Sequence, residues 1–145
     1  MQNHYNLVYR EEEREMIPLC RQEGIAIIPW SPLARGFLTG TRKRTTSDET
    51  LRAKTDEFAR KLYYQESDFE TIDRVVELAA NKGVKPAQIA LAWILHQDGV
   101  TAPIIGVTKM EQLDEAIAAL GLKLEEGEFV YLESSYIPHR VLGHE

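Results

Sequence analysis

The amino-acid sequence predicts a fold of the α/β class, in which parallel strands alternate with crossover helices. Two short apolar runs, residues 25–30 (IAIIPW) and 102–107 (APIIGV), have the composition of strands buried on both faces. Each run follows a segment with helical spacing of its apolar residues. Helices that precede buried strands in this way are expected in a parallel sheet, whose strands need long return connections.

The amino-acid composition excludes several classes of protein. The 145 residues contain 17 Lys and Arg against 23 Asp and Glu, a formal net charge of −6. This acidic balance argues against nucleic-acid partners and against a polybasic protein of membrane surfaces. The apolar runs are far shorter than the roughly 20 residues of a membrane span, and the polar N-terminal segment lacks a secretory signal, so we expect a cytoplasmic protein. Cys20 is a single cysteine, which excludes an internal disulfide.

The first third of the chain predicts a strand, a helix, a second strand and a loop. Residues 1–7 form the first strand, and a helix with an acidic first turn follows over about 11–23. Gly24 supplies the left-handed residue that commonly ends a helix. After the strand at 25–30, residues 31–47 contain proline, glycine and the basic run Arg42-Lys43-Arg44, so we expect a long loop.

The remainder predicts four or more helices and one strand. The expected helices cover about 48–62, 67–82 and 87–96, the last beginning after Pro86 and apolar nearly all round. After the strand at 102–107, Thr108 and Glu111 match a capping box that begins the next helix. Its expected buried stripe is Leu113, Ala116, Ile117 and Leu120. A last helix over about 125–135 turns Phe129 and Leu132 inward, and the tail from 136 is irregular.

The number of strands is too low for a complete sheet. Three strands and five to six helices are expected in 145 residues, whereas a doubly wound sheet of this length usually has five strands. The chain is therefore predicted to be a single partial domain, residues 1–145, of a larger fold.

Candidate ligand-binding residues follow the strands, because parallel α/β folds bind ligands beyond the carboxyl ends of their strands. Gly106 to Lys109 could cradle a phosphate at a helix N-terminus, although a Thr capping box alone is more often purely structural. Trp30 could stack on a planar ring or simply pack in the core. The run 42–44 could close over a phosphate chain or form a solvated loop face.

Several kinds of site are not indicated. The four histidines share no metal-ligand spacing, and no glycine-rich dinucleotide fingerprint, P-loop or nucleophile elbow occurs. Cys20 lies on the apolar side of its helix and is better interpreted as a small core residue than as a nucleophile.

Four segments together resemble the aldo-keto reductase family. They are residues 2–6 (QNHYN), 28–36 (IPWSPLARG), 86–93 (PAQIALAW), and 104–108 (IIGVT) with Gln112 and Leu113. The resemblance covers essentially the whole chain, but only the second half of the family's (β/α)8 TIM barrel, from strand six onward. Because such a barrel needs about 250 residues, we expect that it does not close within this chain.

The resemblance implies a site for NADP(H) without a Rossmann motif. Gln2 would hydrogen-bond the nicotinamide carboxamide and Trp30 would stack on the nicotinamide ring. The pyrophosphate would lie along Ser31, Pro32, Leu33, Ala34 and Arg35.

The adenosine end of the cofactor would lie after the third strand. Gly106, Val107, Thr108 and Lys109 would meet the 2′-phosphate region, and Lys109 favours NADPH over NADH modestly. Gln112 and Glu115 would face the adenosine. Ala116 stands where the family often has an adenine-binding Asn, which removes one expected contact.

The family reduces aldehydes and ketones with a Tyr proton donor assisted by Lys, His and Asp, which belong to the earlier strands. None has a matching position here, so we assign no catalytic residue and expect the isolated chain to be inactive. A carbonyl substrate would need the missing half, supplied by a complementing N-terminal part, while unpaired strand edges favour a homo-oligomer. The alternative is a non-catalytic module for cofactor binding or assembly.

Overall fold

Three extended segments form the centre of the computed structural model, which describes residues 1–41 and 62–140. The middle segment, 26–30, pairs with the N-terminal residues through Ile28 N to Met1 O and Trp30 N to Asn3 O, each 2.8 Å. On its other side Ile104 N donates to Pro29 O, also 2.8 Å. Bridges between His4 and Trp30 and between Ile27 and Val100 are parallel. The order and direction of the segments are thus those of neighbouring strands in a parallel sheet.

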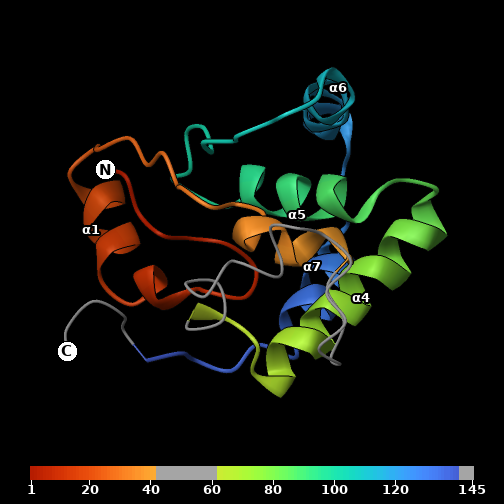
Figure 1. Ribbon diagram of the computed structural model, residues 1–145. Coiled ribbons are helices and arrows are strands. Elements are labelled where there is room, and N and C mark those ends of the chain that lie inside the picture. The colour runs from red at the N-terminus through yellow and green to blue at the C-terminus, as the bar shows by residue number, and fades with distance from the viewer. Residues whose placement is uncertain (42–61, 141–145) are drawn as a thin grey trace.

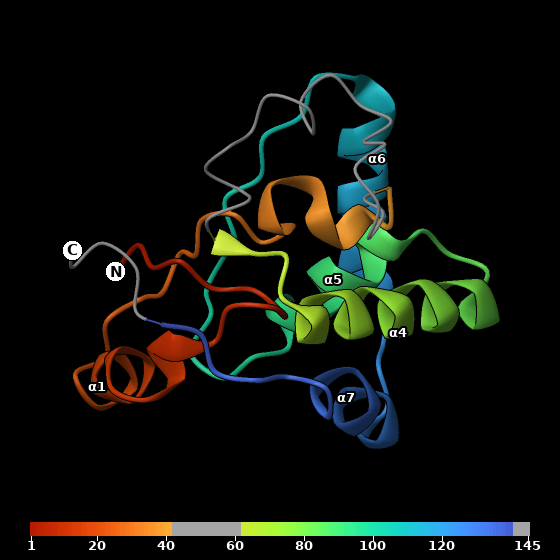
Figure 2. The ribbon, with the colours of Figure 1, turned by 60° about the horizontal axis from the view of Figure 1, so that its bottom comes forward.

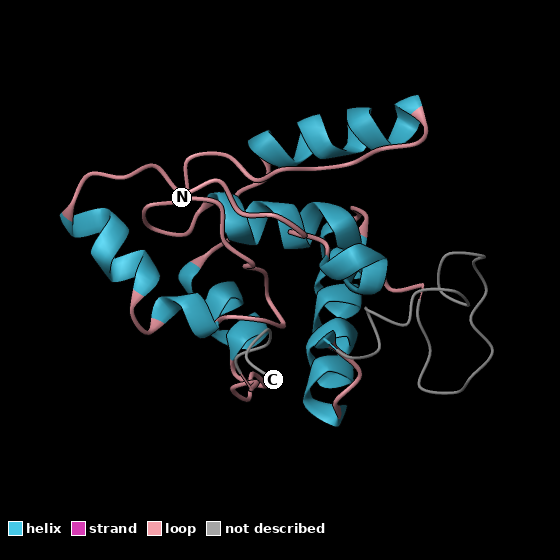
Figure 3. Cartoon of the chain, turned by 60° about the vertical axis from the view of Figure 1, so that its left-hand side comes forward, coloured by secondary structure: helices cyan, strands magenta, loops and turns pink. Residues whose placement is uncertain are grey.

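The expectation of three regular strands is not met in the described part of the chain. Figure 3 draws these segments as loops, and their pairing consists of isolated bridges. Pro29 and Pro103 have no backbone N–H to donate, and within residues 1–41 and 62–140 no further segment forms a bridge to either outer segment from its free side. The predicted strand 102–107 is also displaced, because the third segment pairs with the middle one from Val100 to Ile104.

The helix expected over 11–23 is divided in two. A 3-10 turn, η1 (Glu11–Glu13), precedes α1 (Met16–Gln22). Pro18 explains the division, because its ring would clash with the carbonyl of residue 14 in a continuous helix. Gly24 has φ +65°, which confirms it as the left-handed stop.

A layer of three helices forms most of the core. Helices α4 (Glu66–Lys82), α5 (Pro86–Leu95) and α7 (Glu126–Glu133) agree with the predicted ranges within a few residues. Figure 2 shows α4 between α5 and α7, and α4 packs against both of these helices. The apolar side chains of α5 are buried, with Trp93 fully enclosed, and Leu132 brings α7 into the same core.

Helix α6 (Met110–Ala118) lies at the periphery, at the top of Figure 1. It continues into η3 (Ala119–Gly121) and packs on α5. The predicted buried stripe is wrong in its outer part: Leu113 and Ala116 are half-buried, but Ile117 is 56% and Leu120 68% exposed.

Two further expectations lie outside the described residues, the basic run 42–44 and most of the helix 48–62. The described end of the chain, 134–140, is irregular as expected and returns toward the N-terminal segment. Within 1–41 and 62–140, the longest and most apolar helices fall short of what a membrane crossing requires.

Candidate functional site

The carboxyl ends of the three extended segments meet at one edge of the molecule. The hydrogen bonds that end at Asn3 O and Pro29 O hold the three segments in register at this edge. Gln2 is exposed beside the pairing, and Trp30 is half-buried at its end. The structure therefore brings Gln2, Trp30 and Ile104 onto neighbouring segments, from which the loops 31–35 and 106–109 continue.

Trp30 is one layer of a stack of three rings. The imidazole of His4 lies 4.1 Å from the Trp30 ring, centroid to centroid, and 10° from parallel. On its other side His4 stacks on Tyr9 at 4.2 Å and 16°. One face of the indole thus packs against the protein, as the core-packing interpretation required, and the half-exposed ring retains a second face.

His4 is buried in the middle of this stack. Its Nε2 lies 2.6 Å from the hydroxyl of Tyr63, and the side-chain amide of Asn6 bonds the backbone oxygen of Ser31 at 2.9 Å. Burial, followed by the electrostatic interaction with His139, lowers the pKa of His4 to about 4. His4 is therefore a neutral ring at pH 7.

The loop after Trp30 has an unusual backbone. Ser31, Ala34 and Arg35 all have positive φ, at 54°, 48° and 55°, although none is a glycine. Left-handed conformations cost such residues about 1 kcal/mol each, so the surrounding structure must impose them. Short backbone bonds, Ala34 N to Ser31 O and Gly36 N to Leu33 O at 2.9 Å, close the loop into η2 (Ala34–Thr39).

Buried side chains of the loop and of η2 anchor this strained backbone to the core. Ala34, Phe37 and Leu38 are fully buried, and Pro32 is buried as well, whereas Ser31, Leu33 and Arg35 are half-buried at the surface. Strained backbone that is held by a rigid core is typical of ligand clamps and active sites.

The segment from Gly106 to Lys109 is exposed and leads into α6. The predicted capping box of Thr108 and Glu111 is wrong, because the helix begins one residue later, with Lys109 at the N-cap. Thr108 instead donates from its backbone N and its hydroxyl to Gln112 Oε1, at 2.9 and 3.3 Å. The turn is thereby closed by Gln112.

Glu115, the other residue predicted to face adenosine, already has partners within the chain. Glu115 is half-buried, and its carboxylate pairs with the ammonium group of Lys85. Its backbone oxygen accepts from Gln88 Nε2 at 3.2 Å, which ties α6 to the start of α5.

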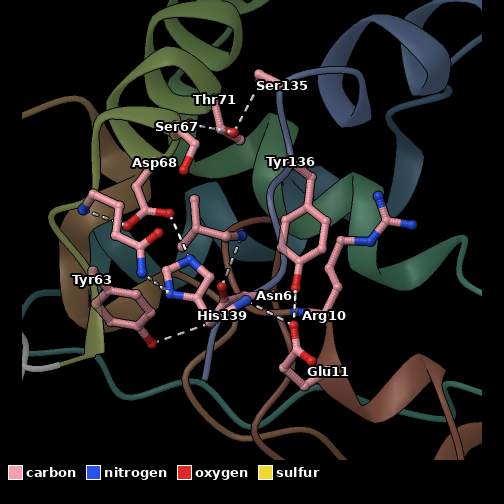
Figure 4. A network of polar contacts seen from close by, with 12 residues as sticks. Asn6, Arg10, Glu11, Tyr63, Ser67, Asp68, Thr71, Ser135, Tyr136 and His139 are labelled. Carbon is pink, nitrogen blue, oxygen red and sulfur yellow. Dashed lines mark hydrogen bonds and ion pairs between the residues drawn. The ribbon is translucent and has the colours of Figure 1, made fainter. Parts of the chain in front are cut away.

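A buried polar network near the site was not predicted (Figure 4). His139 Nε2 lies 2.8 Å from Asp68 Oδ1, with both side chains almost inaccessible. Glu11 accepts from Tyr136 OH at 2.7 Å and from His139 N at 2.8 Å. Burial acts to raise the pKa of Glu11, but these bonds and Arg14 outweigh it and lower that pKa. The network fastens the C-terminal segment to α4 and to η1.

Tyr5, which follows His4 in the chain, holds its proton firmly. Tyr5 donates to Glu13 Oε1 at 2.6 Å, and burial, followed by this bond, raises the pKa of Tyr5. Glu13 is also bound by Arg10, whose guanidinium reaches Glu133 and lies over the Trp93 ring. Tyr5 is thus part of a structural cluster and points to no proton-transfer chemistry.

Comparison with known proteins identifies relatives over nearly the whole chain. The model of the Aldo/keto reductase family matches residues 1–137. Versiconal hemiacetal acetate reductase of Aspergillus parasiticus is 44% identical over 144 residues, which are 97% of this chain and 41% of the relative. Aldo-keto reductase dtxS3 of Metarhizium robertsii is 44% identical over 147 residues, 99% of this chain and 38% of the relative. The chain spans about two fifths of the length of these relatives.

A solved structure has the same arrangement. Glycerol dehydrogenase AKR11B4 from Gluconobacter oxydans superposes with a TM-score of 0.74 at 23% sequence identity, over 97% of this chain and 43% of that chain. This likeness shows that the chain has the fold of part of a TIM barrel. The family match and the shared fold agree, and the chain belongs to the aldo/keto reductase family.

Proposed function

We propose that the chain carries the NADP(H)-binding part of an aldo-keto reductase, its second half-barrel from strand six onward. The observation that carries this proposal is the strained loop 31–35, which is fixed directly after the stacked Trp30 at the carboxyl edge of three parallel segments. Ligands of parallel barrels bind at this edge, and phosphates often lie after strands seven and eight.

The residues present fit the nicotinamide end of such a cofactor. The second face of Trp30 would receive the nicotinamide ring, and the exposed amide of Gln2 would bond the carboxamide. The backbone of Ser31 to Arg35 would line the pyrophosphate. A bound NADPH supplies a hydride; the side chains of this chain orient the ring that carries it.

The residues expected to contact the adenosine end of the cofactor are suited to it only in part. Thr108 and the ammonium group of Lys109 are exposed and would meet the 2′-phosphate, while Gln112 lies one turn along α6. Glu115 would have to leave Lys85 to contact adenosine, and Ala116 offers no amide. We therefore expect weaker adenine contacts than phosphate contacts.

Reduction of an aldehyde or ketone would require residues outside this chain. His4 and Tyr5, which lie near the site, are held in stacking and hydrogen-bonding contacts of their own. The carbonyl substrate would bind only when a complementing N-terminal half, or a fused one, supplies the proton donor.

The exposed face of α6 favours a second candidate function, a non-catalytic assembly module. Met110 and Ile117 of α6 and Leu120 of η3 are each more than half exposed, and exposed apolar side chains of this kind would promote association. A chain that associates and binds NADPH without turnover would serve as a cofactor-binding subunit.

Calorimetric titration of the chain with NADPH and NADH tests the proposal. We expect NADPH to bind more tightly, and Lys109→Ala to weaken NADPH about tenfold while leaving NADH unchanged, since a charge-assisted bond to the 2′-phosphate is lost.

Lys123→Ala is the matched control, because Lys123 is an exposed lysine beyond η3. Equal affinity for both cofactors, or equal effects of the two lysine variants, would contradict the 2′-phosphate assignment. Carbonyl reduction by the isolated chain would contradict the absence of a proton donor.

A further inference from the structure

His4 and Trp30 are paired through their backbones as well as their rings. They form a parallel bridge between neighbouring segments, and such directly opposed residues place their side chains on the same face. The 4.1 Å centroid separation and 10° interplanar angle leave the indole little freedom to tilt on this side.

His4 is itself fixed on every side. Tyr9 closes the stack at 4.2 Å, the Tyr63 hydroxyl lies 2.6 Å from Nε2, and Asn6 Nδ2 lies 3.4 Å from the same atom. The ring therefore has the contacts of a rigid support.

The groups facing His4 also explain its charge. Apart from Tyr9 and Trp30, they are the hydroxyl of Tyr63, the amide of Asn6 and, from the C-terminal segment, His139, which is paired with Asp68. No carboxylate among the described residues hydrogen-bonds His4, and burial lowers its pKa to about 4. A neutral ring behind the indole does not repel the positively charged nicotinamide of NADP+.

We propose that His4 is a positioning residue for the cofactor, which holds the indole of Trp30 flat from behind while the opposite face stacks on the nicotinamide. This inference rests on the proposed function, because it assigns the partner of that opposite face. His4 touches neither cofactor nor substrate and acts through Trp30.

The test separates the nicotinamide end of the cofactor from the adenosine end. Adenosine 2′,5′-bisphosphate occupies only the adenosine end, so the ratio of its dissociation constant to that of NADP+ measures the nicotinamide contribution. His4→Leu retains an apolar side chain of similar volume but removes the aromatic ring. We expect it to weaken NADP+ about fivefold and to leave the bisphosphate unchanged.

Matched variants distinguish positioning from general packing. His4→Phe restores a stacked ring and should return NADP+ affinity to within twofold of the original chain. Tyr63→Phe removes the hydroxyl at Nε2 but leaves the stack, so its effect should be small. Trp30→Ala should lose the whole nicotinamide contribution, and His4→Leu added to it should cause no further loss.

The outcomes are distinct for the two proposals. If the original chain binds NADP+ no more tightly than the bisphosphate, or binds neither, the proposed nicotinamide site fails and this inference fails with it. If the original chain binds NADP+ more tightly and His4→Leu preserves that difference, the cofactor site stands and the role of His4 is overturned. Additive losses in the double variant would also overturn it.

Discussion

The helical layer of α4, α5 and α7 differs sharply from the peripheral helix α6 in how far its apolar side chains are buried. Trp93 and Ile94 of α5 are fully buried, whereas no residue of α6 is buried. Both helices have apolar residues at helical spacing. The difference shows that an apolar helix face in the sequence predicts a contact but does not ensure that the face is buried. Burial depends on which neighbouring elements this chain provides.

The second and third extended segments resemble α6 in leaving apolar side chains exposed, whereas the first segment is buried from Asn3 to Tyr9. Ile25, Ile28, Ile104 and Val107 are 38% to 45% exposed, although their sequence is that of buried strands. The candidate site lies between the buried core and the exposed segments. The loop after Trp30 packs on buried side chains on one side and is half-exposed on the other.

Trp93→Ala should have the largest effect, because it removes the largest fully buried side chain of the helical layer. We expect a loss of about 4 kcal/mol in the free energy of unfolding, since the cavity adds to the lost burial and Glu133 loses its bond from Trp93 Nε1. Urea denaturation followed by circular dichroism measures it. Val130→Ala, on the exposed side of α7, should stay within about 0.5 kcal/mol. Similar losses of unfolding free energy in both variants would contradict the difference between buried and exposed helix faces.

Asp68→Ala should destabilise the chain by about 3 kcal/mol. The substitution leaves His139 buried without its carboxylate partner and removes the acceptor for Gln65 N at the start of α4. The same denaturation experiment measures it, with the exposed Glu70→Ala on α4 as the control. A loss below about 1 kcal/mol would mean that the C-terminal segment is not fastened to α4 as described.

The pH dependence of stability tests the burial of His4. Its pKa is about 4 in the folded chain and near 6.5 when unfolded, so the unfolded chain binds the proton first as the pH falls. We expect His4 to cost about 2 kcal/mol of stability between pH 7 and pH 5, and His4→Phe to abolish that part of the slope. An unaltered slope in His4→Phe would contradict a neutral, buried ring.

Substitutions on the exposed side of α6 and η3 should have the smallest effect on folding. Ile117→Lys with Leu120→Lys should change the free energy of unfolding by about 0.5 kcal/mol or less and reduce self-association measured by sedimentation velocity. Ile94→Lys on α5 should instead unfold the chain, because it buries a charge. If the α6 variant also unfolds, that face is covered within the monomer.

Local patterns predicted the helices well where one residue type decides the backbone. Gly24 and Gly83 end their helices in left-handed conformations, and Pro86 begins α5. The divided helix at Pro18 was missed, although the proline itself was a sufficient signal. The described residues form isolated parallel bridges instead of regular strands, and the buried stripe of α6 was wrong in its outer part. Both features depend on neighbouring segments, which a local sequence pattern does not specify.

The position of the candidate site in the fold could be predicted in outline, while its role in cofactor binding stays a prediction. The family-like segments identified Trp30 and the two loops, and the structure brings the three segments that bear them together at one edge. The support behind Trp30 was missed, because His4, Tyr9 and Tyr63 are separated along the chain and meet only through folding. The alternation of His4 and Asn6 in an extended segment was the available hint.

The most direct test of the account is a map of backbone amide chemical shifts during titration of the chain with NADP+. The account predicts that Gln2, Trp30, residues 31–35 and residues 106–112 shift together with one dissociation constant, while α7 is unaffected. Shifts confined to one loop, or spread over α4 and α7, would contradict a single cofactor site at the edge of the three segments.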